Sequence, residues 1–256
     1  MSIYHINDVS CLKQLFNNWQ ETMIWSCLQG VMGNAWADDI SKPKSAQIVI
    51  ADFCFFAGEP NIELVRNKPE DRKSDFIIMV GQNSEWEELI EKTYTGRAKK
   101  ITRYAIKKEP DAFDIEKLKD IVNRLQEPYR IKLIDGDAYN QIMNNQWSRD
   151  LCSQFQNYRD FMKHGVGVVA TDNGTVVSRA SSYTVYKEGI EIEVDTRSDH
   201  RRKGLALACG AKLIIECLER GLYPSWDAQN MGSVALAEKL GYHFDKEYTA
   251  YEVVGY

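Results

Sequence analysis

The sequence predicts an α/β protein with mixed sheets, divided into two parts between residues 127 and 128. Three observations lead to this prediction. Short apolar runs of strand length alternate with helical segments along the whole chain. Gln126-Glu127-Pro128 interrupts the pattern, because proline cannot continue a helix and disfavours helical geometry in the residue before it. Residues 190–206 have the pattern of a strand, a turn and the start of a helix.

Length and composition place the chain among ordinary globular proteins. Its 256 residues are 44% hydrophobic and 27% charged, with 16 Gly and 6 Pro. The 32 Lys and Arg residues against 37 Asp and Glu give a net charge of −5, which argues against nucleic acids or anionic membranes as partners. No secretory signal is recognisable and no apolar run nears the ~20 residues of a membrane span, so we expect a cytoplasmic protein.

The cysteines and histidines show no metal-ligand spacing. The six cysteines contain no CxxC pair, which argues against a disulfide framework and a thiolate zinc site and favours buried thiols. His5, His164 and His243 lie far apart in the sequence. We therefore expect no metal.

Residues 1–127 are expected to form an N-terminal α+β region. Apolar residues within 11–37 recur at helical spacing, which predicts one or two helices. Short apolar runs separated by Gly, Pro and Asn predict strands at 46–58, 61–65 and 75–81. Next come a helix that begins at Asn83 or Ser84 and runs to about residue 94, a strand at 101–106 and a helix at 114–125.

Residues 128–256 give clearer signals. A strand at 129–135 precedes a helical, aromatic-rich stretch at 137–164. Asp172-Asn173-Gly174 is a hairpin turn signal between two strands within 165–186. The remaining predicted elements are a strand at 189–196, a helix at about 204–220, a short strand at 223–228, a helix at about 231–240 and a terminal strand that ends with TAYEVV at 249–254.

The turn before the helix at 204–220 has the properties of an anion site. The first turn of a helix has free N–H groups and the positive end of the helix dipole. Gly204 has no Cβ to hold an oxygen away from the backbone, and Ala206 is nearly as small. Arg201, Arg202 and Lys203 add positive charge. A solvated basic turn before a core helix is the alternative interpretation.

Two motifs resemble those of the GCN5-related N-acetyltransferases (GNAT). RRKGLA at 201–206, after a strand and opening a helix, resembles the family motif Q/R-x-x-G-x-G/A. NMGS at 230–233 and KLGYHF at 239–244 resemble its second signature. The resemblance covers 128–256 and implies the GNAT fold there. The chain is also similar to a bacterial subgroup that has WSRDLC, EVDT, RRKGLA and PSWDAQN segments.

The resemblance implies acetyl-coenzyme A (acetyl-CoA) as co-substrate and an amine, small-molecule or peptide, as acetyl acceptor. In the family the 201–206 loop holds the pyrophosphate, and the pantetheine arm lies between two strands that splay apart. Ser233 either caps the following helix, which we favour, or reaches the cofactor. The implied cofactor contacts are Val194, Thr196, Arg201, Arg202, Lys203, Gly204, Leu205, Ala206, Asn230 and Ser233.

An amine acceptor must lose a proton, and the strand at 189–196 offers carboxylates for this purpose. The two-residue period of a strand places Glu191, Glu193 and Asp195 on one face. We favour Glu193 as general base, with Glu191 as the other candidate and Asp195 attracting a cationic acceptor. A solvent-facing acidic strand is the alternative.

Several residues near the motifs have open roles. Many relatives carry a tyrosine acid at the position of Ala237, so Tyr242, Tyr248, Tyr251 or a water would have to replace it. Trp226 and Asp227 either shape the acceptor pocket, or Trp226 is a core residue and Asp227 a solvated residue beside it. For His200 we favour packing or cofactor contact over catalysis.

The N-terminal region has no RxxGxA sequence. Its helices followed by strands resemble the first half of the GNAT fold, which suggests a degenerate copy that walls the acceptor cleft or mediates association. A homodimer remains open. The rival functions are a catalytically silent acyl-CoA-binding module and a regulatory or structural protein.

Overall fold

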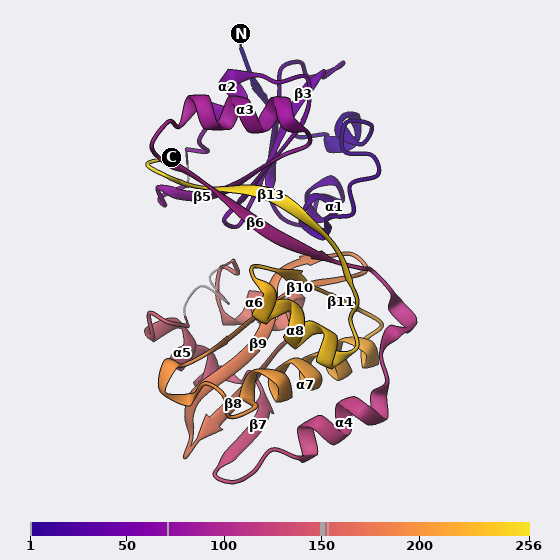
Figure 1. Cartoon of the computed structure of the whole chain (residues 1–256), viewed down its shortest axis with the longest axis vertical. Coiled ribbons are helices and arrows are strands. Elements are labelled where there is room, and N and C mark those ends of the chain that lie inside the picture. The colour runs from indigo at the N-terminus through magenta and orange to yellow at the C-terminus, as the bar shows by residue number, and fades with distance from the viewer. Residues whose placement is uncertain (1, 71, 149–151, 153) are drawn as a thin grey trace. The chain divides into compact units, whose positions relative to one another are not determined.

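The chain folds as two units (Figure 1). The computed structural model describes residues 2–70, 72–148, 152 and 154–256. The N-terminal unit comprises the chain up to Arg103 together with Glu247–Tyr256, and the C-terminal unit comprises Tyr104–Lys246. None of the described helices is long and apolar enough to cross a membrane.

These boundaries differ from the predicted seam between residues 127 and 128, which lies inside the C-terminal unit. Helix α4 (Ile115–Asn123) precedes that seam, yet it buries Leu118 and packs along α7 (Leu205–Glu219). Pro128 does follow the end of α4. However, the position at which a helix ends does not indicate which element the helix packs against.

The sheet of the N-terminal unit is formed mainly by antiparallel strands. The first four strands pair antiparallel in sequence order, and the fourth then pairs parallel with the fifth. The elements are β1 (Tyr4–His5), η1 (Val9–Leu12), α1 (Thr22–Leu28), β2 (Asn34–Ala37), β3 (Ser45–Ile50), β4 (Phe53–Gly58), α2 (Ile62–Arg66), β5 (Phe76–Gly81), α3 (Ser84–Thr93) and the start of β6 (Ala98–Ile106).

Two predictions for this unit need correction. Residues 61–65, predicted as a strand, lie in and before helix α2, because the Asn61 side chain accepts the Glu63 N–H at 3.0 Å and caps the helix. Residues 34–37, predicted within a helical stretch, form strand β2, because Gly30 and Gly33 adopt positive φ after α1. The predicted cap of α3 is Asn83, which accepts the Trp86 N–H at 3.2 Å.

The C-terminal unit contains a five-stranded sheet of order β11-β10-β9-β8-β7. Strands β7 to β10 pair antiparallel in sequence order, and β10 pairs parallel with β11. Besides α4 and α7, the unit contains η2 (Pro110–Ala112), β7 (Tyr129–Leu133), α5 (Gly136–Asn144), α6 (Tyr158–His164), β8 (Gly167–Asp172), β9 (Thr175–Tyr186), β10 (Gly189–Thr196), η4 (Ser198–His200), β11 (Tyr223–Ser225), β12 (Asp227–Ala228) and α8 (Met231–Leu240).

Most of the predicted elements of this unit are present. The hairpin turn joins β8 to β9 with Asn173 and Gly174 at φ 47° and 84°. The helical stretch predicted at 137–164 consists of the two separate helices α5 and α6, and residues 149–151 and 153 lie outside the described residues. The last strand, β13 (Phe244–Val254), ends at the predicted residue.

The two units have the same order of elements, which confirms that the N-terminal region resembles the C-terminal one. In each unit four strands pair antiparallel, one or more helices separate the first strand from the second, and a helix joins the fourth strand to a parallel fifth. A second helix follows the fifth strand in both, α3 in one and α8 in the other. The fold is therefore a duplicated mixed α/β fold.

The two units exchange their last strands. Residues 251–254 of β13 pair with β5 in the N-terminal unit, whereas Tyr104 and Ala105 of β6 pair with β12 in the C-terminal unit. Tyr251 and Val253 are fully buried in the core around Trp86 and Phe56. The end of the chain is therefore part of the N-terminal core.

Candidate active site

The predicted anion site lies where β10 leads through η4 into α7. Gly204 is the N-cap residue of α7, with φ 77° and no side-chain cap. A Cβ at Gly204 would meet no atom within 4 Å, so the space above its backbone is open. Arg202 also has positive φ, 63°. The segment therefore turns sharply with its backbone exposed to a ligand.

The backbone N–H groups at this turn are free to bind an anion. Among the described residues, the N–H groups of 202–207 donate to no backbone or side-chain acceptor, and the first helical bond runs from Ala208 N–H to Gly204 C=O at 3.0 Å. The α7 first turn has no acidic residue. Several donors therefore converge at the positive end of a 15-residue helix.

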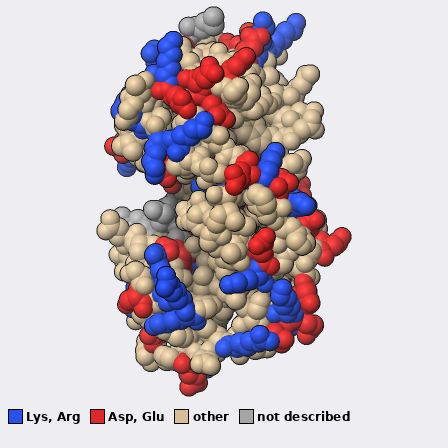
Figure 2. Space-filling model, in the orientation of Figure 1, with Lys and Arg blue, Asp and Glu red and all other residues tan. Residues whose placement is uncertain are grey.

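Basic side chains flank this turn. The Arg201 side chain is 64% exposed, with Nη2 3.8 Å from Asp195 Oδ1. Lys203 Nζ donates to the Tyr129 hydroxyl at 3.1 Å. Over the face shown in Figure 2, Lys and Arg are interspersed with Asp and Glu. The structure therefore does not show an extended basic surface on that face, and positive charge is supplied locally.

His200 anchors the turn to the neighbouring hairpin. Its side chain is 9% exposed, with Nδ1 2.8 Å from Asp199 Oδ1 and Nε2 3.2 Å from Asp172 Oδ2. Hydrogen bonds from Arg197 and then from His200 hold the pKa of Asp199 well below its usual range. His200 is therefore buried and bonded to both Asp199 and the hairpin residue Asp172, and these contacts hold the loop in position.

Strands β10 and β11 separate beside the turn. Their parallel pairing runs from Gly189↔Tyr223 to Glu191↔Ser225 and stops there. The chain then continues through Trp226 into β12, which pairs with β6 instead. Within the described part of the chain, β10 continues to Thr196 with no further partner on that edge. Val194 and Thr196, predicted to contact a pantetheine arm, lie on this open stretch.

The three carboxylates of β10 differ in burial. Glu191 is 3% exposed, Glu193 is half-buried and the Asp195 side chain is 39% exposed. Glu191 is thus not part of a solvent-facing acidic strand. It lies where β10 still pairs with β11, whereas Glu193 lies on the open stretch. Glu191 is therefore enclosed, whereas Glu193 and Asp195 are both partly exposed.

Sequence reasoning missed a group of side chains on the Glu193 side of the sheet. Arg179 and Ser181 on β9 lie opposite Asp195 and Glu193. Burial raises the pKa of the Cys152 thiol to about 11, and the charges of Arg179 and Glu193 act on the same thiol. Arg179 is fully buried, 5.9 Å from the Trp147 ring centroid. The available signal was a single charged residue, Arg179, within the otherwise uncharged strand pattern at 175–186.

The residues of the second motif have structural partners. Asn230 is the N-cap of α8, and its Oδ1 accepts the Ser233 N–H at 3.0 Å, so the cap that we assigned to Ser233 belongs to Asn230. The Ser233 hydroxyl instead accepts the Trp226 indole N–H at 3.0 Å. Trp226 is 4% exposed and packs on Tyr242. The half-buried Asp227 belongs to β12.

The tyrosines considered as acids have other partners. Ala237, at the position where relatives carry tyrosine, is fully buried. The Tyr242 hydroxyl donates to the Pro224 carbonyl at 2.6 Å, and burial raises the Tyr242 pKa well above its usual value. In the N-terminal unit, Tyr251 donates to Glu91 at 2.6 Å and Arg103 Nε donates to the Tyr248 hydroxyl at 3.2 Å.

Over the described residues, no group of three or more His, Cys, Asp or Glu side chains could hold a metal ion.

Comparisons with known proteins agree with this geometry. A family model described as GNAT acetyltransferase matches residues 13–251. A GCN5-related N-acetyltransferase-like protein from Streptococcus suis 89/1591 is 45% identical, with a TM-score of 0.90 over 96% of this chain and 98% of that one. The uncharacterized N-acetyltransferase YdfB of Bacillus subtilis is 26% identical over 94% of both chains.

A more distant similarity bears on the duplication. A tandem GNAT protein from the clavulanic acid biosynthesis pathway is 10% identical, with a TM-score of 0.57 over 100% of this chain and 99% of that one. That likeness shows a shared fold along the full length of both chains. With a family model that matches nearly the whole sequence, this chain belongs to the GNAT acetyltransferase family.

Proposed function

We propose that the protein is an acetyl-CoA-dependent N-acetyltransferase that moves an acetyl group from the thioester sulfur to the nitrogen of an amine acceptor. The observation that carries the proposal is the set of unpaired N–H groups at 202–207, at the start of α7. Such donors are suited to a pyrophosphate, since a helix N-terminus favours negative charge.

The remaining residues fit the shape of this co-substrate. The open space above Gly204 admits phosphate oxygens, and Arg201 and Lys203 lie beside it. We assign the pantetheine contacts to the open edge of β10 at Val194 and Thr196 and to Asn230. The other loop contacts that we assign are Arg202, Leu205 and Ala206. When bound, acetyl-CoA would supply an acyl carbon open to attack and a thiolate leaving group.

Deprotonation of the acceptor is assigned to Glu193. An amine with a pKa of about 10.4 is neutral about once in 2,500 molecules at pH 7, a cost of about 4.6 kcal/mol. Glu193 is half-buried on the open stretch of β10, whereas Glu191 is enclosed where the strands still pair. Glu193 can therefore take the proton directly or through a water, and Glu191 is the second choice.

The acceptor is a small molecule or peptide that carries an amine. We assign its attraction to Asp195, whose partly exposed carboxylate follows Glu193 on the same face of β10. Asp227, which is half-buried, is the further acceptor contact that we propose. Trp226 would shape the acceptor pocket through packing, since its indole N–H is bonded to Ser233.

One observation favours a second candidate, a module that binds acyl-CoA without catalysis. Ala237 stands where relatives carry an acid, and the hydroxyls of Tyr242 and Tyr251 donate elsewhere. However, a thiolate whose conjugate acid has a pKa of about 8.5 leaves tolerably without a proton. The missing tyrosine therefore slows the reaction without forbidding it.

Two measurements on the purified full chain test these candidates. Calorimetric titration with acetyl-CoA should show saturable binding, and acetylpantetheine, which lacks the pyrophosphate, should bind more weakly. Release of free thiol should rise when amines of a varied panel are added. Binding without amine-dependent thiol release would support the silent module. Absence of binding would refute both candidates.

A further inference from the structure

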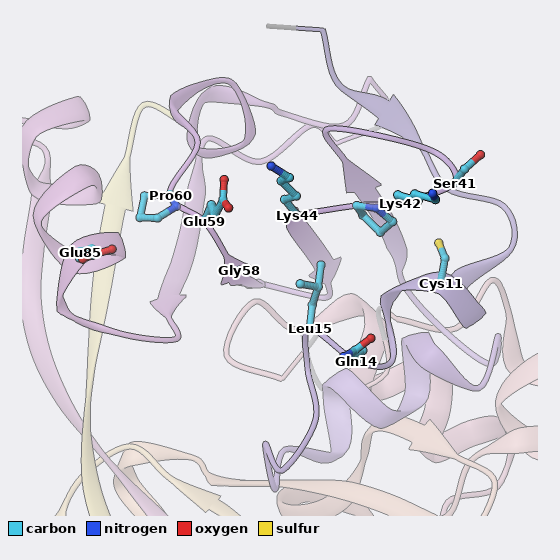
Figure 3. Close-up of a pocket in the computed structure, with 11 residues that line it drawn as sticks. Cys11, Gln14, Leu15, Ser41, Lys42, Lys44, Gly58, Glu59, Pro60 and Glu85 are labelled. Atoms are coloured by element: carbon cyan, nitrogen blue, oxygen red, sulfur yellow. The ribbon is translucent and has the colours of Figure 1, made fainter.

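The N-terminal unit contains an open pocket of about 770 Å³ (Figure 3). Three segments that are distant in the sequence form it: residues 11–15, the loop 41–44 and residues 58–60. Glu85, in the first turn of α3, closes one side. The volume is in the range of small-molecule sites. Sequence analysis gave no signal for this pocket.

The backbone around the pocket is fixed by hydrogen bonds. The Gln82 amide joins two of the three segments, because its Oε1 accepts the Gly58 N–H at 3.1 Å and its Nε2 donates to the Leu15 carbonyl at 2.8 Å. Glu59 N–H donates to Lys44 C=O at 2.9 Å and so joins residues 58–60 to the loop 41–44. The walls are therefore pre-organised, which lowers the cost of binding a ligand.

Loop 41–44 is fixed in the same way. Asp39 Oδ1 accepts the N–H groups of Ser41 and Lys42 at 2.7 and 2.8 Å, and Asp38 Oδ1 accepts that of Lys44 at 3.0 Å. The backbone bonds from Lys42 and Ser41 lower the Asp39 pKa. Both aspartates accept backbone N–H groups and so fix the backbone of the loop, and neither forms an ion pair with the Lys42 or Lys44 ammonium group.

The charged side chains at the pocket are available to a ligand. Lys42, Lys44, Glu59 and Glu85 are all exposed, and none forms an ion pair with another described residue. Figure 3 shows Lys44 and Glu59 extending from neighbouring segments, with Leu15 between the charged groups and Gln14. The pocket thus offers two cations, two anions and an apolar side chain.

The position of the pocket in the fold excludes a polyphosphate. Residues 58–61 join β4 to α2 in the same way as residues 197–204 join β10 to α7. Here, however, the turn carries Glu59, the first helical turn carries Glu63, and Asn61 already occupies the Glu63 N–H. An anion-only ligand in the pocket would meet the carboxylates of Glu59 and Glu85, and the adjacent start of α2 carries Glu63.

We propose that this pocket binds a small zwitterion, a molecule of amino-acid or dipeptide class with one carboxylate and one ammonium group. Lys44, supported by Lys42, receives the carboxylate, and Glu59 and Glu85 receive the ammonium group. Leu15 contacts an apolar portion of the ligand. This proposal is independent of the proposed acetyl transfer, because every residue it uses lies in the N-terminal unit.

The test uses three matched probes on the isotopically labelled full chain: alanyl-alanine, its N-acetyl form and its C-terminal amide. Backbone amide spectra recorded during titration should show saturable shifts confined to residues lining the pocket. The zwitterion should bind at least about tenfold more tightly than either capped form, since each cap removes one charge contact worth about 1.4 kcal/mol. Stronger binding of the N-acetyl form, or no shifts at the pocket, would overturn the proposal.

Single substitutions identify which charge receives which group. In Lys44→Gln, alanyl-alanine should bind no better than its amide; in Glu59→Gln, it should bind no better than its N-acetyl form. Lys119→Gln and Glu116→Gln, which alter an exposed ion pair on α4, are the matched controls and should leave the three affinities unchanged. Unchanged discrimination in both pocket variants would contradict the assignment, whatever the outcome with acetyl-CoA.

Discussion

The two units differ most at the helix that joins the fourth strand to the fifth. In the C-terminal unit this helix, α7, has 15 residues, no side-chain cap and no acid in its first turn. In the N-terminal unit its counterpart α2 has 5 residues, an asparagine cap and Glu63 in the first turn. The same topology thus leaves the helix start without a side-chain cap or an acid in one unit, and places an asparagine cap and a carboxylate there in the other.

This comparison shows which feature of the duplicated fold carries function. The strand pairing is shared, so the sheet alone does not create an anion site. What differs at the helix start is the side-chain cap and the charge: α2 has the Asn61 cap and Glu63, whereas α7 has neither a cap nor an acid. In the N-terminal unit the Asn61 side chain accepts an N–H group of the first helical turn. In the C-terminal unit the N-cap residue is Gly204, which has no side chain that could accept one.

The largest effect is expected from removing the exchanged strand. A chain truncated after Lys246 loses Tyr251 and Val253, both fully buried beside Trp86 in the N-terminal core. Because each large buried side chain contributes about 3 kcal/mol, the N-terminal unit should fail to fold. Amide dispersion in NMR spectra would report the loss for residues 2–103.

Val254→Ala is the matched control on the same strand, because that side chain is 55% exposed. It should change the free energy of unfolding by less than about 0.5 kcal/mol. A truncated chain whose N-terminal unit keeps its native spectrum would show that β13 is not needed there.

The next largest effect concerns the anion site. Gly204→Glu places a carboxylate where the free N–H groups converge, so calorimetry should detect no acetyl-CoA binding, a loss of at least about 100-fold. Gly221→Glu is the matched control: it has φ 70° and open space around it, but lies after α7 instead of before it. An equal loss of acetyl-CoA affinity in both variants would indicate that backbone strain, and not the carboxylate at the helix start, causes the loss.

The sequence predicted the C-terminal unit better than the N-terminal one, for physical reasons. Asn173-Gly174 and the alternation in 189–196 are local signals that fix a hairpin and a strand. In contrast, the segment 61–65 is too short for its periodicity to distinguish a helix from a strand. The hydrogen bond from the Glu63 N–H to the Asn61 side chain favours the helix. The exchange of β6 and β13 depends on pairing between distant segments, which no local pattern encodes.

The same distinction applies to the candidate site. The helix start at 201–206 could be predicted because a strand, a glycine and a helix follow one another directly in the sequence. The neighbourhood of Arg179 and Cys152 could not, since it depends on the register between β9 and β10 and on a segment before α6. The N-terminal pocket likewise joins three distant segments.

A smaller effect is expected at the general base. Glu193→Gln keeps the shape of the side chain but cannot accept the amine proton, so kcat should fall by about 100-fold with little change in acetyl-CoA affinity. Glu191→Gln, at the enclosed position of the same strand, should lower kcat less. Steady-state kinetics with calorimetry would separate the two effects. Wild-type turnover in Glu193→Gln would remove Glu193 from the mechanism.

The smallest expected effect concerns the stability of residues 197–207, which lead from β10 into α7. Hydrogen bonds from Arg197 and His200 lower the pKa of Asp199 below its unfolded value of about 3.9. This contribution to loop stability is present above that value and is lost as the pH falls below it. Asp199→Asn should therefore weaken the acid sensitivity of amide exchange in 197–207. Asp39→Asn is the control, because Asp39 also accepts backbone N–H groups but lies in the N-terminal unit, and it should alter exchange only around 41–44. Identical pH profiles in Asp199→Asn and wild type would show that the loop is held by packing around His200 alone.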